Sequence, residues 1–150
     1  MKILKIVGVG LVVLFVLITP VGYMLPTSVT VTGSIAVDAS PEAIYPLIAN
    51  LEEGWPQWSP WNDPKYQITY SGPKEGVGAK SHWQDNGDNQ LTVVKADPKT
   101  GAEFDLVMMN ESFRMKSSLL CEPRNGKTEV TWTDDIDYSD KLYYRYFGLI

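Results

Sequence analysis

Residues 102–136 read AEFDLVMMNESFRMKSSLLCEPRNGKTEVTWTDDI, and their pattern decides the fold. Apolar and polar side chains alternate along three segments, 102–109, 113–121 and 128–136, as they do in strands that bury one face of a sheet. Short turns separate the three segments, and the second of these turns contains Asn125-Gly126. Strands joined by such short turns must be antiparallel neighbours, so the stretch predicts a three-stranded meander.

The same pattern continues toward the N-terminus. Further strands are predicted at 29–37, 66–70, 79–84 and 90–96, each bounded by turn-forming residues. After the first strand, Ser40 can cap a helix, and Pro41 suits its first position. Ile44, Leu47 and Ile48 then form an apolar stripe at helical spacing. Strands in one meander with a helix inserted after the first predict an α+β fold.

A long apolar run precedes this domain. Residues 6–25 contain no charged side chain, and about 20 residues of helix span the roughly 30 Å of a bilayer's hydrocarbon core. Lys2 and Lys5 precede the run, and the next basic residue is Lys65. This asymmetry predicts a single-pass cell-membrane protein with a cytoplasmic N-terminus and a periplasmic or extracellular domain.

A cleaved signal peptide is the alternative interpretation of the same run. The run exceeds the 7–15 residues of a signal-peptide core, and residues 19–28 lack a small-x-small cleavage pattern. We therefore expect a transmembrane anchor at 1–25, a linker at 26–28 and one domain at 29–150.

Charge and cysteine content restrict the function. The chain carries 13 Lys and Arg against 18 Asp and Glu, for a net charge of −5. Nucleic-acid binding requires clustered basic charge, so this class is excluded. The single cysteine, Cys121, precludes an internal disulfide and is interpreted as a small buried residue of a strand.

The polar residues show no pattern typical of catalysis or metal binding. His82 is the only histidine, and the alternation places it opposite Trp83, on the outer face of its strand. One histidine and one cysteine cannot form a typical zinc site. The acidic run 133–140 lacks the glycine and the terminal Glu of a calcium loop. We therefore predict no catalytic residue, no metal and no cofactor.

Three tryptophans lie within residues 55–61, WPQWSPW. Such a rigid aromatic segment has three interpretations. It can cap one end of the sheet with its indole N–H groups bonded to carbonyls, form the mouth of a cavity, or enter the lipid headgroup layer.

The end of the chain returns to a helical pattern from about residue 140. Leu142 and Tyr146, with Leu149 or Ile150, share one side of this helix. No capping or terminating residue follows, so we expect the helix to be incomplete at Ile150.

Several motifs in combination resemble a known family. These are residues 37–45, VDASPEAIY; 55–61; 70–79, YSGPKEGVGA; the strand 80–84; and 126–132, GKTEVTW. Over about 29–147 the chain is similar to START-like (SRPBCC) proteins of the bacterial polyketide cyclase/dehydrase and lipid-transport group. The resemblance implies a helix-grip, Bet v 1-like fold. In that fold a curved antiparallel sheet of six or seven strands, two small helices after the first strand and a C-terminal helix enclose a cavity. The family's long C-terminal helix is mostly absent from this sequence.

The period-2 alternation selects most of the side chains that the resemblance makes ligand-cavity candidates; Trp58 and Trp61 are added from the tryptophan segment and Tyr70 as a polar group near the cavity. The candidates are Trp58, Trp61, Tyr70, Trp83, Leu106, Met108, Phe113, Met115, Ser117, Leu119 and Trp132. Methionines among large aromatics suit a cavity that tolerates ligands of several shapes. The same residues would also build an ordinary core.

These observations together predict a membrane-anchored bacterial protein that binds a hydrophobic small molecule or lipid without chemistry. One alternative is a polyketide cyclase or dehydratase in the same cavity, for which the polar candidates are Tyr70, Ser81, Ser117 and Asp134. A second alternative is an envelope interaction module whose cavity is filled by its own side chains. The sequence leaves the oligomeric state open.

Overall fold

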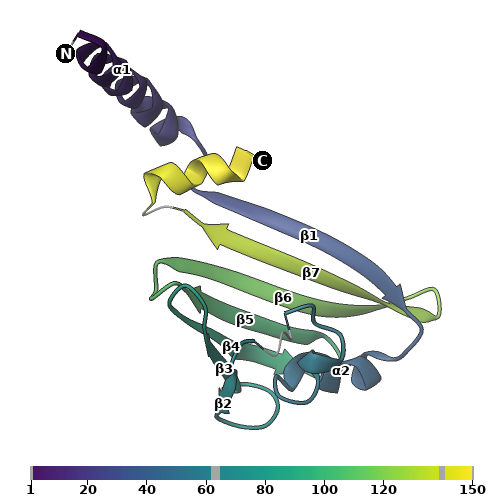
Figure 1. The fold of residues 1–150 in the computed structure, drawn as a ribbon. Helices are drawn as coiled ribbons and strands as arrows, with labels where there is room; N and C mark the ends of the chain where they lie inside the picture. Colours follow the sequence, from purple (N-terminus) through teal and green to yellow (C-terminus); the bar gives the residue numbers. More distant parts are fainter. Residues whose placement is uncertain (1, 62–64, 139–140, 150) are drawn as a thin grey trace. The chain divides into compact units, whose positions relative to one another are not determined.

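The computed structural model describes residues 2–61, 65–138 and 141–149 (Figure 1). Its helices are α1 (Lys2–Met24), α2 (Pro41–Ala49) and the 3₁₀ helices η1 (Trp55–Gln57) and η2 (Leu142–Leu149). Its strands are β1 (Ser28–Val37), β2 (Thr69–Ser71), β3 (Lys80–Gln84), β4 (Asp88–Asp97), β5 (Gly101–Met108), β6 (Phe113–Arg124) and β7 (Lys127–Asp137).

The chain forms two compact units. The sheet unit is Thr30–Ile136, and the terminal unit combines Met1–Val29 with Asp137–Ile150.

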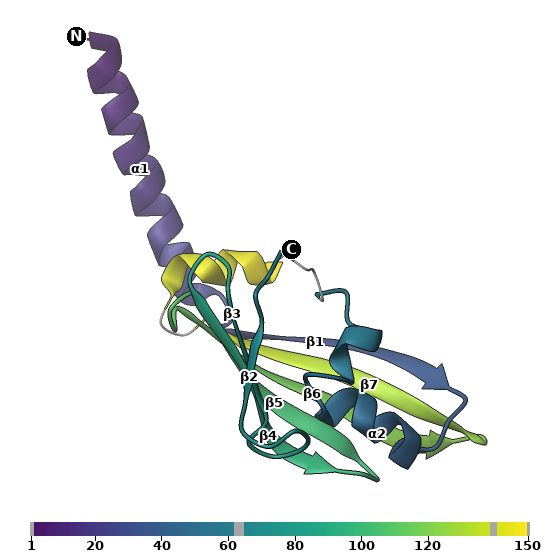
Figure 2. The ribbon, with the colours of Figure 1, turned by 60° about the horizontal axis from the view of Figure 1, so that its bottom comes forward.

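The described strands of the sheet unit form one sheet in the order β1-β7-β6-β5-β4-β3-β2. The neighbours from β2 to β6 are antiparallel, with Tyr70 opposite Ser81 and Phe104 opposite Ser117. Only β1 departs from sequential order, because it lies at the edge beside β7. This curved meander, with α2 against one face, confirms the predicted helix-grip fold (Figure 2).

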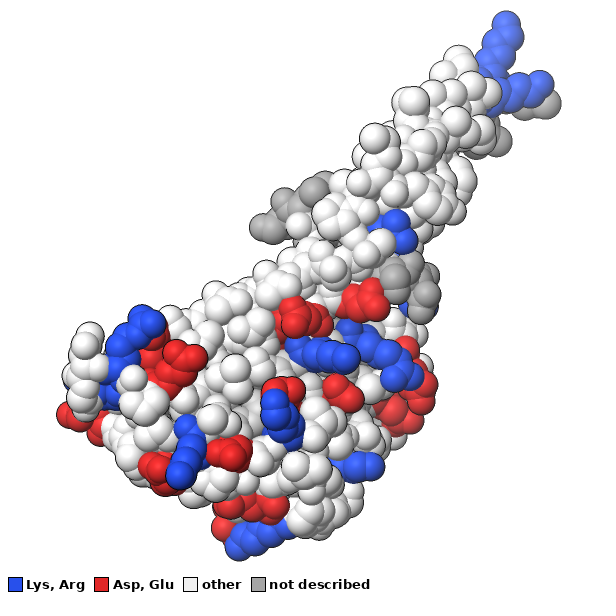
Figure 3. Space-filling model, turned by 180° about the vertical axis from the view of Figure 1, so that it is seen from behind, with Lys and Arg blue, Asp and Glu red and all other residues white. Residues whose placement is uncertain are grey.

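The core lies between α2 and the face of the sheet that it covers. Ile44 and Ile48 of α2 are buried against Val93, Phe104 and Leu119 of the central strands. Buried and more exposed residues alternate along β4 and β6 as predicted: Leu119 of β6 is buried while its neighbour Leu120 is exposed. Almost every residue of the edge strand β1 is exposed, so the alternation predicted for it does not appear in its burial. The opposite face carries acidic and basic side chains interspersed with one another (Figure 3).

Some boundaries differ from the sequence prediction. The predicted strand 66–70 is only Thr69–Ser71, and it pairs with β3 at the far edge of the sheet. Tyr66 instead uses its hydroxyl to donate a hydrogen bond to Asp85 Oδ2 at 3.1 Å, and so belongs to the loop before β2. The second of the two predicted small helices is a single 3₁₀ turn, η1, which contains Pro56.

In the terminal unit, η2 contacts α1. The Tyr146 hydroxyl donates a hydrogen bond to the Ile18 carbonyl, and Leu142 and Tyr146 both lie against Gly22, where a Cβ would meet them at 3.1–3.2 Å. The predicted shared side of Leu142 and Tyr146 is therefore present, although the helix is 3₁₀ rather than α. The predicted start at residue 140 and the apolar end at Ile150 lie outside the described residues.

Among the described helices, Lys5–Met24 is long and apolar enough to cross a membrane, and few of its residues are buried. An anchor and a signal sequence both meet this criterion.

Candidate ligand-binding site

The tryptophan segment is fixed to the C-terminal end of α2. The last four carbonyls of an α-helix lack partners within the helix. Here the Trp58 indole N–H donates to the Leu47 carbonyl at 2.8 Å, and the Trp55 indole N–H donates to the Ile48 carbonyl at 2.6 Å. Two backbone N–H groups, from Asn50 and Gly76, donate to the remaining carbonyls, those of Pro46 and Ala49. The indole groups thus cap a helix.

The aromatic rings of this segment gather around Trp132 of β7. The Trp132 ring centroid lies 6.3 Å from that of Trp55, 5.8 Å from Trp58 and 5.5 Å from Trp61, all in edge-on geometry. Trp55 also meets Phe104 of β5 edge-on at 5.4 Å. We call Trp55, Trp58, Trp61 and Trp132 the tryptophan cluster. It lies over the concave face of the sheet and separates two hollows there.

The first hollow, the β3 pocket, has a volume of about 280 Å³ and lies toward β2, β3, β4 and β5. Trp55 and Trp61 of the cluster form one wall, and Tyr66, Tyr70 and Trp83 add three further aromatic rings. Its polar lining includes Ser59, Ser81, Asp85, Asn86 and Asn89. The pocket is therefore aromatic with a polar part.

The second hollow, the β1 groove, has a volume of about 580 Å³ and lies between β1, α2 and β7. It is lined by Gly33, Ser34, Ile35, Val37, Ile44, Leu47, Ile48, Trp58, Leu119, Val130 and Trp132. Almost every one of these side chains is apolar, and Ile35 remains 65% exposed. The groove is therefore an open apolar surface.

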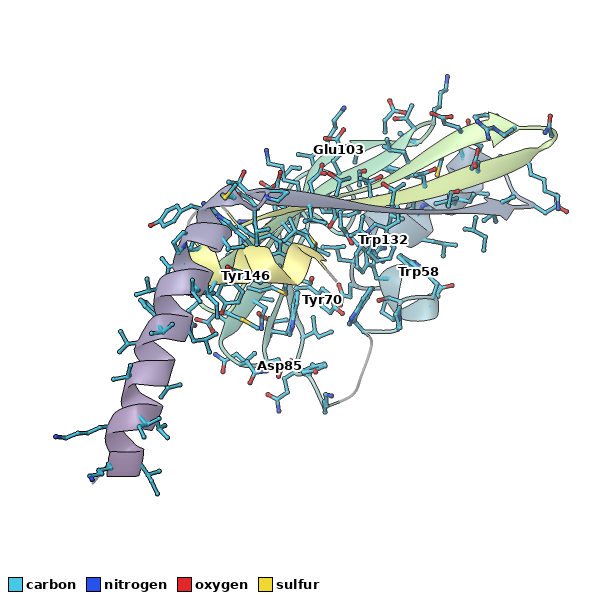
Figure 4. All side chains as sticks on the ribbon, turned by 90° about the horizontal axis from the view of Figure 1, so that it is seen from above. Trp58, Tyr70, Asp85, Glu103, Trp132 and Tyr146 are labelled. Carbon is cyan, nitrogen blue, oxygen red and sulfur yellow. The ribbon has the colours of Figure 1, made fainter. Side chains whose placement is uncertain are left out.

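Figure 4 shows the sidedness of the site. Trp58, Trp132, Tyr70 and Asp85 lie on one side of the sheet, whereas Glu103 points away from the opposite face. Glu103 forms an ion pair with Lys95 of the neighbouring strand at 2.7 Å. This outer acid lines neither hollow.

Two of the polar candidates meet inside the β3 pocket. Tyr70 and Ser81 are directly opposite each other on β2 and β3, and both line the pocket. Burial, with a smaller effect of the Glu52 carboxylate, raises the pKa of the Tyr70 phenol above its usual range. The phenol is therefore a neutral hydrogen-bond donor.

The other two polar candidates are bonded to each other. Ser117 Oγ donates to Asp134 Oδ1 at 2.5 Å, and the Trp132 indole N–H donates to the same oxygen at 2.8 Å. This carboxylate thereby fixes the orientation of the ring at the centre of the tryptophan cluster. The Asp134 carboxylate thus holds other side chains in place, and both of its contacts are to the protein itself.

The predicted cavity residues divide into three sets. Trp61, Tyr70, Trp83 and Met108 line the β3 pocket, and Trp58, Leu119 and Trp132 line the β1 groove. The structure places the remaining four, Leu106, Phe113, Met115 and Ser117, in cross-strand pairs on the same face of β5 and β6, outside the linings of these two hollows. Whether each touches a ligand remains a prediction.

Several lining residues were not selected from the sequence. They include Tyr66 and Asp85, which the loop before β2 and the β3–β4 turn bring together. Asn89 is another: its Nδ2 donates to the carbonyls of Asp85 and Gly87, and its Oδ1 accepts from the Met109 N–H. A polar residue at a core position of the β4 alternation was the available signal for Asn89.

The single histidine and the single cysteine lie in surroundings that do not indicate catalysis. His82 Nε2 lies 3.8 Å from Asp88 Oδ1 on the outer face. Cys121 is buried, and burial raises the pKa of its thiol. Within the described ranges, no group of three His, Cys, Asp or Glu residues could hold a metal ion.

Comparisons with known proteins identify the family. Residues 28–143 match the family described as polyketide cyclase / dehydrase and lipid transport. No protein of curated function matches the chain.

Solved structures with a similar fold include norcoclaurine synthase from Thalictrum flavum, in complex with dopamine and hydroxybenzaldehyde. It is 12% identical with a TM-score of 0.60, over 87% of this chain and 81% of that one. Major latex-like protein 151 from Panax ginseng is 16% identical with a TM-score of 0.57, over 83% and 96%. At such identities these structures show a shared fold alone, whereas the family match covers most of the sequence. The chain therefore belongs to the polyketide cyclase/dehydrase and lipid transport family.

Proposed function

We propose that this protein binds an apolar small molecule or lipid at the membrane, without chemistry. The observation that carries the proposal is the pair of hollows on either side of the tryptophan cluster. The compact β3 pocket suits a ring or a head group, and the apolar β1 groove suits a hydrocarbon chain. Ligand sites typically combine such an apolar lining with a few polar groups that orient the ligand.

Two further observations support binding over a filled interaction module. The described side chains leave both hollows open, although five aromatic residues converge on the β3 pocket. Norcoclaurine synthase, on a similar fold, was solved with two small aromatic molecules, dopamine and hydroxybenzaldehyde.

Residues 1–25 would anchor the protein in the membrane, with the N-terminus in the cytoplasm and the domain on the periplasmic or extracellular side of a bacterial membrane. The length and composition of α1 and its N-terminal lysines support this topology. A charge at the centre of α1, in Leu14→Lys, should cost about 2.5–3.5 kcal/mol of insertion free energy. Most of the variant should then leave membranes washed with alkaline carbonate, while Ala36→Lys on β1 should stay. Equal retention would contradict the anchor.

The binding proposal is tested by native mass spectrometry of the full chain released from detergent. We expect the protein to carry one bound apolar ligand per chain, detected as an added mass. Ser81→Leu fills the β3 pocket and should reduce this adduct, whereas the control His82→Leu places the same side chain on the other face of β3. An apo mass that persists after incubation with membrane lipid extract would favour the interaction module.

A second candidate function, a cyclase or dehydratase, is favoured by the pairing of Tyr70 and Ser81 inside the pocket. Tyr70→Phe removes the phenol O–H but keeps the ring. A dehydrating enzyme would accumulate a bound species heavier than the wild-type adduct by one water in this variant. Identical adduct masses would support binding alone.

A further inference from the structure

The lining of the β3 pocket is rich in aromatic side chains. Five rings line its volume of about 280 Å³: Trp55, Trp61, Tyr66, Tyr70 and Trp83. They come from η1, from the segment after it that leads into β2, from β2 and from β3, all within residues 55–83. The face of an aromatic ring carries a negative quadrupole and attracts cations.

The charge in this pocket has one sign. Of the described residues that line it, only Asp85 carries a charge. The Asp85 carboxylate accepts a hydrogen bond from the Tyr66 hydroxyl at 3.1 Å, which holds it beside the aromatic wall. Glu52 is close enough to Tyr70 to raise the pKa of the phenol further. An anionic ligand group would be repelled here.

One ring face already receives a cation from the chain itself. Lys65 Nζ lies 4.6 Å from the centroid of the Tyr66 ring. A ligand cation would therefore rely on the indole and phenol faces of Trp55, Trp61, Tyr70 and Trp83. The lysine itself does not line the pocket.

We propose that the β3 pocket binds an organic ammonium group, held by the aromatic faces and by the Asp85 carboxylate. The inference rests on the proposed binding function and names the head group of the ligand. Aromatic faces favour a methylated ammonium in particular, because it sheds water more readily than a bare ammonium and still carries a full charge. Such a group occurs both in lipid head groups and in free amines.

The test uses two probes that differ by one atom: choline and its neutral isostere 3,3-dimethyl-1-butanol. The full chain is labelled with 5-fluorotryptophan and placed in phosphatidylglycerol nanodiscs, which contain no ammonium. The chain has five tryptophans. Three of them, Trp55, Trp61 and Trp83, line the β3 pocket, and Trp58 and Trp132 line the β1 groove. The ¹⁹F signal of Trp83, which lies outside the tryptophan cluster, therefore reports on the β3 pocket alone, and the other four signals report on the cluster between the two hollows.

Choline should shift the three pocket signals and bind about two- to fivefold more tightly than the neutral isostere, the range expected for a cation over partly exposed aromatic rings, since Trp61 is 61% exposed. Asp85→Asn keeps an oxygen for the Tyr66 hydroxyl but removes the charge, so it should weaken choline binding several-fold and leave the isostere unaffected. The matched control is Glu103→Gln, which removes an acid from the outer face.

Equal affinities for the two probes, or choline binding unchanged in Asp85→Asn, would overturn the proposal. The native adduct mass would still decide the binding function on its own. Replacing part of the phosphatidylglycerol by phosphatidylcholine distinguishes the two sources. Pocket signals that shift in these nanodiscs identify a lipid head group, and signals that shift only with free choline identify a soluble amine; both results support the ammonium.

Discussion

Replacing Trp55 by Phe separates the two roles of this residue. Phe keeps a six-membered ring for the edge-on contacts with Phe104 and Trp132, but it removes the indole N–H that bonds to the Ile48 carbonyl at 2.6 Å. This hydrogen bond is partly buried, so the carbonyl is left without a partner at the end of α2. An unsatisfied buried carbonyl costs about 1–3 kcal/mol, and the smaller ring adds about 1 kcal/mol. We expect a loss of about 2–4 kcal/mol in the free energy of unfolding.

Trp58→Phe is the matched comparison, since Trp58 makes the same type of bond to the neighbouring Leu47 carbonyl. Trp58 is 38% exposed, and its hydrogen bond is at the surface. Water can replace the indole there, so the expected loss is about 1 kcal/mol or less.

The assay is urea unfolding of the full chain in detergent micelles, followed by the near-ultraviolet and far-ultraviolet circular dichroism. Midpoints are compared only where the slope with urea is unchanged, so that a shift reports stability. Equal losses in Trp55→Phe and Trp58→Phe would refute the reasoning, because burial of the carbonyl would then not determine the cost.

Three further changes follow from buried groups and backbone geometry. Thr128 is 1% exposed, and its hydroxyl donates a hydrogen bond to the Ala39 carbonyl at 2.6 Å. Thr128→Val removes this donor and should lower the free energy of urea unfolding by about 1–3 kcal/mol. Thr128→Ser keeps the hydroxyl and should retain most of the wild-type stability. Burial raises the pKa of the Cys121 thiol, so the unfolded chain loses this proton first; stability should be unaffected at neutral pH and decline as pH rises above about 8.5. A Cys121→Ala variant with the same decline would contradict this assignment. Gly101 has a φ of +101°, and a Cβ would lie 2.0 Å from the Leu119 carbonyl oxygen; Gly101→Ala should therefore prevent folding or shift the urea midpoint strongly, and a native midpoint would exclude the clash.

Much of the site's framework follows from local pattern. Period-2 alternation predicts which residues of β5 and β6 face the helix, because successive side chains of a strand must point to opposite faces. The cross-strand pair of Phe104 and Ser117 lies on that face as expected. The helix at Pro41–Ala49 is likewise predicted from its cap, since the Ser40 hydroxyl accepts a hydrogen bond from the Ala43 N–H at 3.3 Å.

The sequence by itself determined the meander, the family and the aromatic character of the concave face, since alternation, turn residues and motif spacing are local properties. Only the tertiary structure decided that Trp132 divides this face into a pocket and a groove, and that Tyr66 and Asp85 meet at the pocket. The physical reason is that these contacts join segments far apart in the chain, whose geometry depends on how the sheet curves and where the loop before β2 returns. The sequence shows which residues are charged or aromatic. Only the folded chain brings these side chains together around one small pocket.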